Sequence, residues 1–170
     1  GLIERVSAAT LLVEQAFERS YAAFCAGAAL VMIDREFRAL YPVSFKTGGS
    51  FTAVAAKGDY NLAGDAKGNV FILRQRAHAQ LPIPASTAPI RRIVFHPAPG
   101  SFRALVLGAH VAIVDASSGT TPIPEDQLPV ALREAVKDVL WVDTLPAVVT
   151  TAGEVIILDA SLTPCSSTFI

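Results

Sequence analysis

The chain has 170 residues, of which 52% are hydrophobic and 17% are charged, and its formal net charge at pH 7 is −1. This charge balance argues against a general affinity for nucleic acid, and no apolar run reaches the roughly 18 residues of a membrane helix. The high apolar content predicts that much of the folded surface is covered by another segment, a second copy or a partner.

Short apolar segments, rich in β-branched residues and bounded by Gly, Pro, Asn or Asp, follow one another along the chain and predict an all-β fold. Two segments depart from this pattern, because residues 2–19 and 125–138 place apolar residues at helical spacing and are each compatible with one short amphipathic helix. The proline-bearing residues 80–89 and 120–124 are typical of extended connections or edge strands. In chain order, the predicted strands are residues 21–26, 29–33, 51–55, 60–63, 70–73, 90–95, 102–107, 111–114, 136–142, 147–150 and 155–158.

The predicted strands repeat in a fixed order. Residues 90–120 (IRRIVFHPAPGSFRALVLGAHVAIVDASSGT) contain a strand, a Pro/Gly turn, a second strand, a Gly-containing turn, a third strand ending in Asp and a Ser/Gly turn. Residues 136–161 and 50–75 follow the same plan, and residues 21–43 match its latter half. Equivalent first strands begin near Phe51, Ile90 and Val136, and their spacing of about 40–46 residues is the period of a propeller blade.

This repeat resembles the WD40 family, in which the third strand typically ends in Trp-Asp. The corresponding pairs here are Ile33-Asp34, Val114-Asp115 and Leu158-Asp159, so an aliphatic residue replaces the Trp each time, and no Gly-His pair precedes the first strands. The resemblance implies a partial β-propeller of antiparallel blades that packing, rather than a side-chain hydrogen-bond network, holds together. Each blade then has neighbours on both faces, which explains continuous apolar strands such as residues 155–158.

On this interpretation, residues 1–20 form an N-terminal segment that is compatible with a helix, and residues 21–170 form four blade-like units. The predicted units are residues 21–49, 50–89, 90–130 and 131–170, of which the first and last are incomplete. Complete rings of this kind usually have more blades. Because open ends leave apolar faces uncovered, we expect the chain by itself to self-associate or aggregate.

The sequence offers few residues for chemistry. Asp34, Asp115 and Asp159 each end an apolar strand, and their recurrence once per repeat favours a structural role in which the carboxylate accepts hydrogen bonds from turn amides. The Gly-rich residues 64–69 are interpreted as a hairpin turn, since no helix follows that would complete a phosphate-binding loop. Neither the three histidines nor the two cysteines have the spacing of a metal site, and no catalytic residue, metal or cofactor is predicted.

The candidate binding residues are Arg91, Arg92, Lys67 and His110. Arg91 and Arg92 open a first strand, which in the resembled fold lies near the face where propellers usually take peptides or acidic partners. Lys67 and His110 lie in second-to-third-strand turns that the resemblance places on the same face. The alternative is that these side chains are simply solvated or ion-paired.

The predicted function is that of a non-catalytic WD40-like scaffold for protein–protein interaction within a larger assembly. We expect an intracellular, cytoplasmic location and protein subunits as partners, with neither membrane insertion nor nucleic-acid binding. One alternative is a hydrolase-type enzyme on an α/β scaffold that uses the strand-end aspartates. The connections at residues 26–29, 108–110 and 151–154 are too short for the crossovers that such a scaffold needs. A further alternative is that the chain only completes the ring of a neighbour.

Overall fold

The structure is a computed structural model that describes residues 16–18, 21–26, 29–34, 39–44, 51–58, 60–74 and 83–169. The surroundings of side chains are described for residues 51–58, 60–72 and 83–169. As predicted, the fold is all-β. The described strands form four sheets of four strands each, and every pair of neighbouring strands is antiparallel.

The sheets are named in chain order. The first sheet has β1 (Ala16–Glu18), β2 (Tyr21–Ala26), β3 (Ala29–Asp34) and β4 (Ala39–Ser44). The second has β5 (Phe51–Lys57), β6 (Tyr60–Asp65), β7 (Asn69–Arg74) and β8 (Ile83–Pro84). The third has β9 (Arg92–Phe95), β10 (Arg103–Leu107), β11 (Val111–Asp115) and β12 (Thr120–Ile123). The fourth has β13 (Val136–Val142), β14 (Leu145–Thr150), β15 (Glu154–Leu158) and β16 (Pro164–Phe169).

Helix is almost absent from the described residues. Residues 125–138, whose spacing is compatible with one amphipathic helix, form only a 3-10 turn, η1 (Glu125–Gln127), and a single helical turn, α2 (Val130–Arg133), before the chain continues as a strand. Val136 already begins β13, where pairing with β14 and burial against the third sheet outweigh the helical spacing. The helix predicted over residues 2–19 does not include Ala16–Glu18, which pair with β2, and the rest of that range lies outside the described residues.

The sequence suggested that the first and last units are incomplete. In the structure each of them has four strands, so both are complete sheets. Three strands of these two sheets were not predicted: β1 has three residues, β4 has the sequence ALYPVS with a proline inside it, and β16 has the sequence PCSSTF with every residue exposed. Neither β1 nor β16 has an apolar alternation from which a strand could be predicted.

The predicted tight hairpins are confirmed. β10 pairs with β11, and β14 pairs with β15, through connections too short for a helix. The β14–β15 turn includes Gly153 at φ +84°, a conformation that favours glycine over residues with a side chain.

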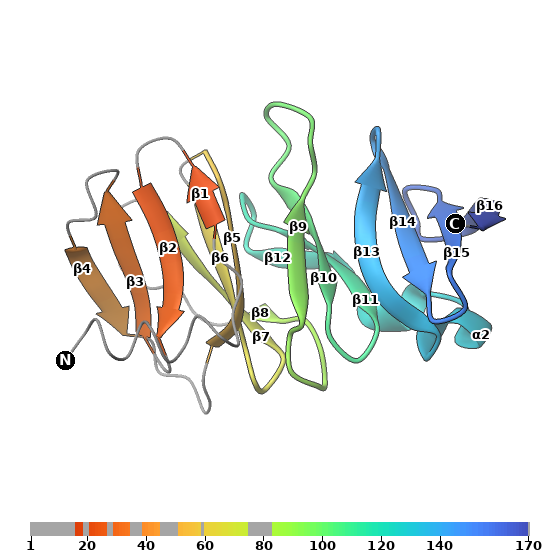
Figure 1. Ribbon diagram of the computed structural model, residues 1–170, viewed down its shortest axis with the longest axis horizontal. Coiled ribbons are helices and arrows are strands. Elements are labelled where there is room, and N and C mark those ends of the chain that lie inside the picture. The colour runs from red at the N-terminus through yellow and green to blue at the C-terminus, as the bar shows by residue number, and fades with distance from the viewer. Residues whose placement is uncertain are drawn as a thin grey trace.

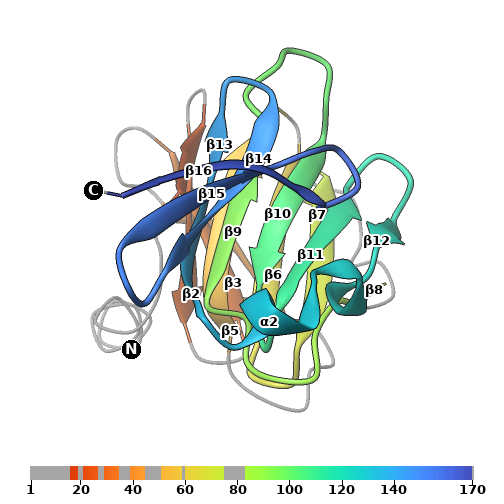
Figure 2. The same ribbon diagram turned by 90° about the vertical axis from the view of Figure 1, so that its right-hand side faces the viewer.

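The four sheets lie side by side along the long axis of the molecule, with the first sheet at one end and the fourth at the other (Figure 1). The first strands of successive sheets are in contact: β1 with β5, β5 with β9, and β9 with β13. Figure 2 looks along this stack and shows the sheets overlying one another. The described sheets therefore meet face to face, in chain order.

Alternate residues of β10 pack in opposite directions. Ala104 and Val106 belong to a buried cluster with residues of the second sheet, whereas Leu105 and Leu107 belong to a cluster with residues of the fourth. All four side chains are at most 2% exposed. An inner strand of the stack is therefore apolar at every position, because both of its faces are covered.

Candidate binding surfaces

The turns of the second and third sheets and the segments that follow those sheets meet on one side of the stack, the side on which α2 lies in Figure 1. This surface comprises residues 66–68, 85–91, 108–110 and η1, and is called the loop rim. Its first part is the turn between β6 and β7. The buried carboxylate of Asp65 accepts hydrogen bonds from the backbone N–H groups of Lys67, at 2.9 Å, and Asn69, at 2.8 Å. The prediction that residues 64–69 form a hairpin turn is thus confirmed.

Ser86 joins this turn to the next sheet. Its backbone N–H donates to the carbonyl of Gly68 at 2.9 Å, and its Oγ accepts the backbone N–H of Ala109 at 2.7 Å. The backbone of Ser86 approaches Gly68 so closely that a Cβ on Gly68 would lie 2.0 Å from the Ser86 carbonyl oxygen. A Cβ on Gly108 would lie 2.1 Å from the side-chain Oγ of Ser86. Both positions therefore require glycine.

Glu125, in η1, makes the second bridge of the loop rim. Its carboxylate accepts the backbone N–H of Thr87 at 3.0 Å through Oε1 and that of His110 at 3.3 Å through Oε2. Nδ1 of His110 lies 3.2 Å from the carbonyl oxygen of Arg133. Because a carbonyl oxygen can only accept, Nδ1 must carry the hydrogen in this contact. The loop rim is therefore braced by side chains from three segments.

The four candidate binding residues occupy different environments. Arg91 is exposed, and its guanidinium lies over the backbone, with Nε donating to the Gly108 carbonyl at 3.4 Å and Nη2 to the Val136 carbonyl at 3.5 Å. Lys67 is exposed at its turn, and His110 is partly buried. Arg92 instead pairs with Asp138 of β13, with 3.0 Å between Nε and Oδ1, so that its charge is balanced locally. The structure brings Arg91, Lys67 and His110 together on the loop rim, and Arg92 links two sheets.

The opposite side of the stack has its own connections, which sequence reasoning missed. The ammonium of Lys57 donates to the carbonyl oxygens of His96, of Ala98 at 2.7 Å and of Ser101 at 2.7 Å. This places a charge from the second sheet inside the β9–β10 loop of the third. No sequence pattern marks Lys57, because its acceptors are backbone atoms about forty residues further on.

A histidine and the single tryptophan connect the third sheet to the fourth on this side. The rings of His96 and Trp141 meet edge to face, with their centroids 4.6 Å apart, and Trp141 Nε1 donates to the Val94 carbonyl at 2.9 Å. Nδ1 of His96 accepts the N–H of Ala98, so Nε2 carries the hydrogen shared with the Thr144 carbonyl. Trp141 therefore packs between two sheets.

The strand-end aspartates have the structural role that the sequence indicated. Oδ1 of Asp159 accepts the N–H groups of Ser161 and Thr163, and Oδ1 of Asp115 accepts both the N–H and the hydroxyl of Ser117. Burial raises the pKa of Asp115, but the hydrogen bonds of the Ser turn and the charge of Arg103 outweigh burial and lower it. The side chain of Asp34 lies outside the described residues.

The antiparallel pairing bears on the alternative hydrolase hypothesis. That hypothesis needs parallel strands joined by helical crossovers, whereas every pair among the described strands is antiparallel. Nor does the described part of the chain bring three or more His, Cys, Asp or Glu side chains into an arrangement that would hold a metal ion. None of the helices described here is long and apolar enough to cross a membrane.

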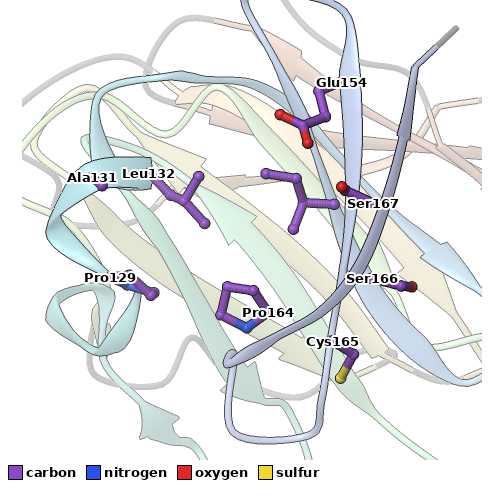
Figure 3. Close-up of a pocket in the computed structure, with 9 residues that line it drawn as sticks. Pro129, Ala131, Leu132, Glu154, Pro164, Cys165, Ser166 and Ser167 are labelled. Carbon is purple, nitrogen blue, oxygen red and sulfur yellow. The ribbon is translucent and has the colours of Figure 1, made fainter.

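A groove opens where β16 diverges from the third sheet (Figure 3). It has a volume of about 470 Å³. Leu132 of α2 and Pro164 of β16 point into it from opposite sides, and Ile156 of β15 contributes to its apolar lining. The sequence did not indicate this groove, because it depends on α2 lying against a strand more than thirty residues further on. Its lining residues are Pro129, Ala131, Leu132, Glu154, Ile156, Pro164, Cys165, Ser166 and Ser167.

No family model and no curated protein matches the chain. Among solved structures, the chain is similar to the computationally designed protein Ika8, with a TM-score of 0.71 and 12% identity over 91% of this chain and 48% of that one. The arrangement is β-propeller-like. A chain of the Mitotic Checkpoint Complex matches with a TM-score of 0.72 and 11% identity over 92% of this chain and 53% of that one. The designed protein Ika4 matches with a TM-score of 0.67 and 14% identity over 87% and 96%. The chain thus spans about half the length of two of these neighbours.

Proposed function

We propose that the chain is a non-catalytic, divergent WD40-like scaffold that binds protein partners within a larger intracellular assembly, and that the loop rim is its binding surface. The observation that carries this proposal is the bracing of the rim by Ser86 and Glu125, which link its loops to one another. A surface that is already ordered loses little conformational entropy on binding, and so keeps more of its contact energy as affinity.

The charge of the rim favours an acidic partner. Lys67 and Arg91 are both exposed there, and Arg91 is held in one orientation by two backbone carbonyls. Among the acidic residues beside them, Asp65 and Glu125 have their carboxylates turned to backbone N–H groups, and Asp126 of η1 is exposed. Fixed positive charge on a rigid rim steers and orients an acidic peptide or subunit more than it adds affinity.

The test is to capture partners of the chain from an extract of its source cells, identify them by mass spectrometry, and measure their association kinetics at two salt concentrations. We expect Lys67→Glu combined with Arg91→Glu to slow association about tenfold at low salt, and less at high salt, with the fold intact. Arg92 is left unchanged, because reversing it would place two carboxylates together at Asp138.

The control is Arg103→Gln, which removes a half-exposed charge at the start of β10, on the opposite side of the stack from the loop rim, without placing a second carboxylate beside Asp115. It should leave the association rate unchanged. Equal rates for the wild-type chain and the double variant would show that the rim is not the binding surface. Loss of binding in the Arg103→Gln control would place the partner on the other side.

A further inference from the structure

The fourth sheet lies at one end of the described stack. The residue pattern of the third strand on its outward face matches that of a face that is buried in the third sheet. The sequences of the two third strands align as VAIVD in β11 and VIILD in β15. In the third sheet Val111 pairs with Leu107 and Ile113 with Leu105, and in the fourth Val155 pairs with Val149 and Ile157 with Ala147. Strand register therefore makes Val155 equivalent to Val111, and Ile157 equivalent to Ile113.

The equivalent residues differ only in what covers them. Val111 is 0% exposed and Ile113 is 2% exposed, because both pack in the cluster that joins the third sheet to the fourth. Val155 and Ile157 lie on the face turned away from that cluster and are partly exposed, as is Val149 beside them. The fourth sheet thus presents the same kind of apolar face with no described sheet against it.

The first sheet ends the stack on the other side. In the β2–β3 register, one alternating set contains the pairs Ala22–Ile33 and Phe24–Val31, and the other contains Ala23–Met32 and Cys25–Leu30. Both sets are apolar. Since only one face of the sheet can be turned to β5 of the second sheet, an apolar set lies on the outward face whichever way the sheet is turned.

We propose that a second copy of this chain covers both end faces. The fourth sheet of each copy packs on the first sheet of the other, and the two stacks close into one ring around a two-fold axis. One copy cannot bring its own end faces together, because they lie at opposite ends of the stack (Figure 1). Two copies supply both halves of two identical contacts, and such closed symmetry is the commonest in soluble oligomers.

Two observations favour a second copy as the occupant. The required contact, one apolar face of a four-stranded sheet on another, already joins successive sheets within the chain. The chain also matches 48% of the Ika8 chain and 53% of the matched chain in the Mitotic Checkpoint Complex, so each of those similarly folded chains has the length of about two copies of this one. The pairing does not depend on whether the loop rim binds a partner.

The test is sedimentation equilibrium of the chain over a wide range of concentrations. We expect twice the mass of one chain and no further growth as the concentration rises. Ile157→Arg places a charge in the centre of the end face and should raise the dimer dissociation constant by at least about 100-fold. The matched control is Val130→Arg, at an apolar side chain that is 75% exposed on α2, and it should remain a dimer.

Thr168→Arg guards against a folding defect, because Thr168 is an exposed residue of β16 on the same face as Val155. It should dissociate the dimer as well. A wild-type chain that stays monomeric while folded overturns the proposal, as does a mass that keeps growing with concentration, which would indicate open-ended stacking. A dimer that survives both Ile157→Arg and Thr168→Arg places the interface elsewhere and also overturns it.

Discussion

The third and fourth sheets have the same strand order and the same register at their central hairpins, but only the third has a described sheet on both sides. In the third sheet both alternating sets of side chains are buried, one against the second sheet and the other against the fourth. In the fourth, Ile156 and Leu158 are buried, whereas Val155 and Ile157 between them are partly exposed. A strand that is apolar at every position is therefore expected to have another sheet packed on each of its two faces.

Ile113 and Ile157 occupy equivalent positions in the third and fourth sheets, and substitutions there should differ most in their effect on the free energy of unfolding. Ile113→Ala should lower the free energy of unfolding by about 2–5 kcal/mol, because it leaves a cavity between two sheets. Ile157→Ala should cost less than about 1.5 kcal/mol, since its side chain is only partly buried and the change leaves no enclosed cavity between two sheets. Urea unfolding of both, in a Thr168→Arg background that keeps the end face uncovered, gives the comparison. Equal losses would mean that the two faces are covered alike.

The next effect contrasts two lysines of the second sheet. Lys57→Met should destabilise the chain by about 1–3 kcal/mol, because three carbonyl oxygens of the β9–β10 loop lose their shared donor. Lys67→Met changes an exposed residue and should stay within about 0.5 kcal/mol of the wild type. Thermal unfolding of the two variants measures this difference. A harmless Lys57→Met would show that the ammonium does not join the two sheets.

The smallest effect concerns Asp115 at the end of β11. Its lowered pKa means that the ionised carboxylate stabilises the fold above the ordinary Asp pKa, and that this stabilisation is lost as the pH falls through the lowered value. Because the group is near the surface, the contribution should be less than about 1 kcal/mol. Asp115→Asn should accordingly reduce the loss of stability between pH 6 and pH 3, measured by urea unfolding. An unchanged loss would assign the acid sensitivity to other groups.

Much of the fold follows from local sequence. Strands such as β10, β11 and β15 are apolar runs between turn residues, and the Asp that ends β11 and the Asp that follows β15 mark the next turn. The polar strand β16 has no such signal and exists because it pairs with β15. In residues 125–138 the sequence pattern indicates a helix where a strand begins. Burial of Val136 and Val139 against the third sheet outweighs the helical spacing there.

The candidate surfaces could be predicted only in part. The order of strands within a repeat is enough to place Arg91, Lys67 and His110 on one side. The pairing of Arg92 with Asp138 could not be foreseen, because it joins two sheets 46 positions apart along the chain (138 minus 92). The bracing of the loop rim by Glu125 likewise depends on where η1 lies after the third sheet.

The most direct test of the stacked arrangement is a double-mutant cycle between Tyr60 of the second sheet and Phe102, just before β10 of the third, whose ring centroids are 4.6 Å apart. Stacked sheets predict a coupling energy of about 0.5–1.5 kcal/mol in equilibrium unfolding for Tyr60→Ala with Phe102→Ala. Tyr60→Ala with Trp141→Ala, which lie at different sheet interfaces, should be additive within about 0.5 kcal/mol. Additivity in the first pair, or equal coupling in both, would contradict the stacking of these sheets.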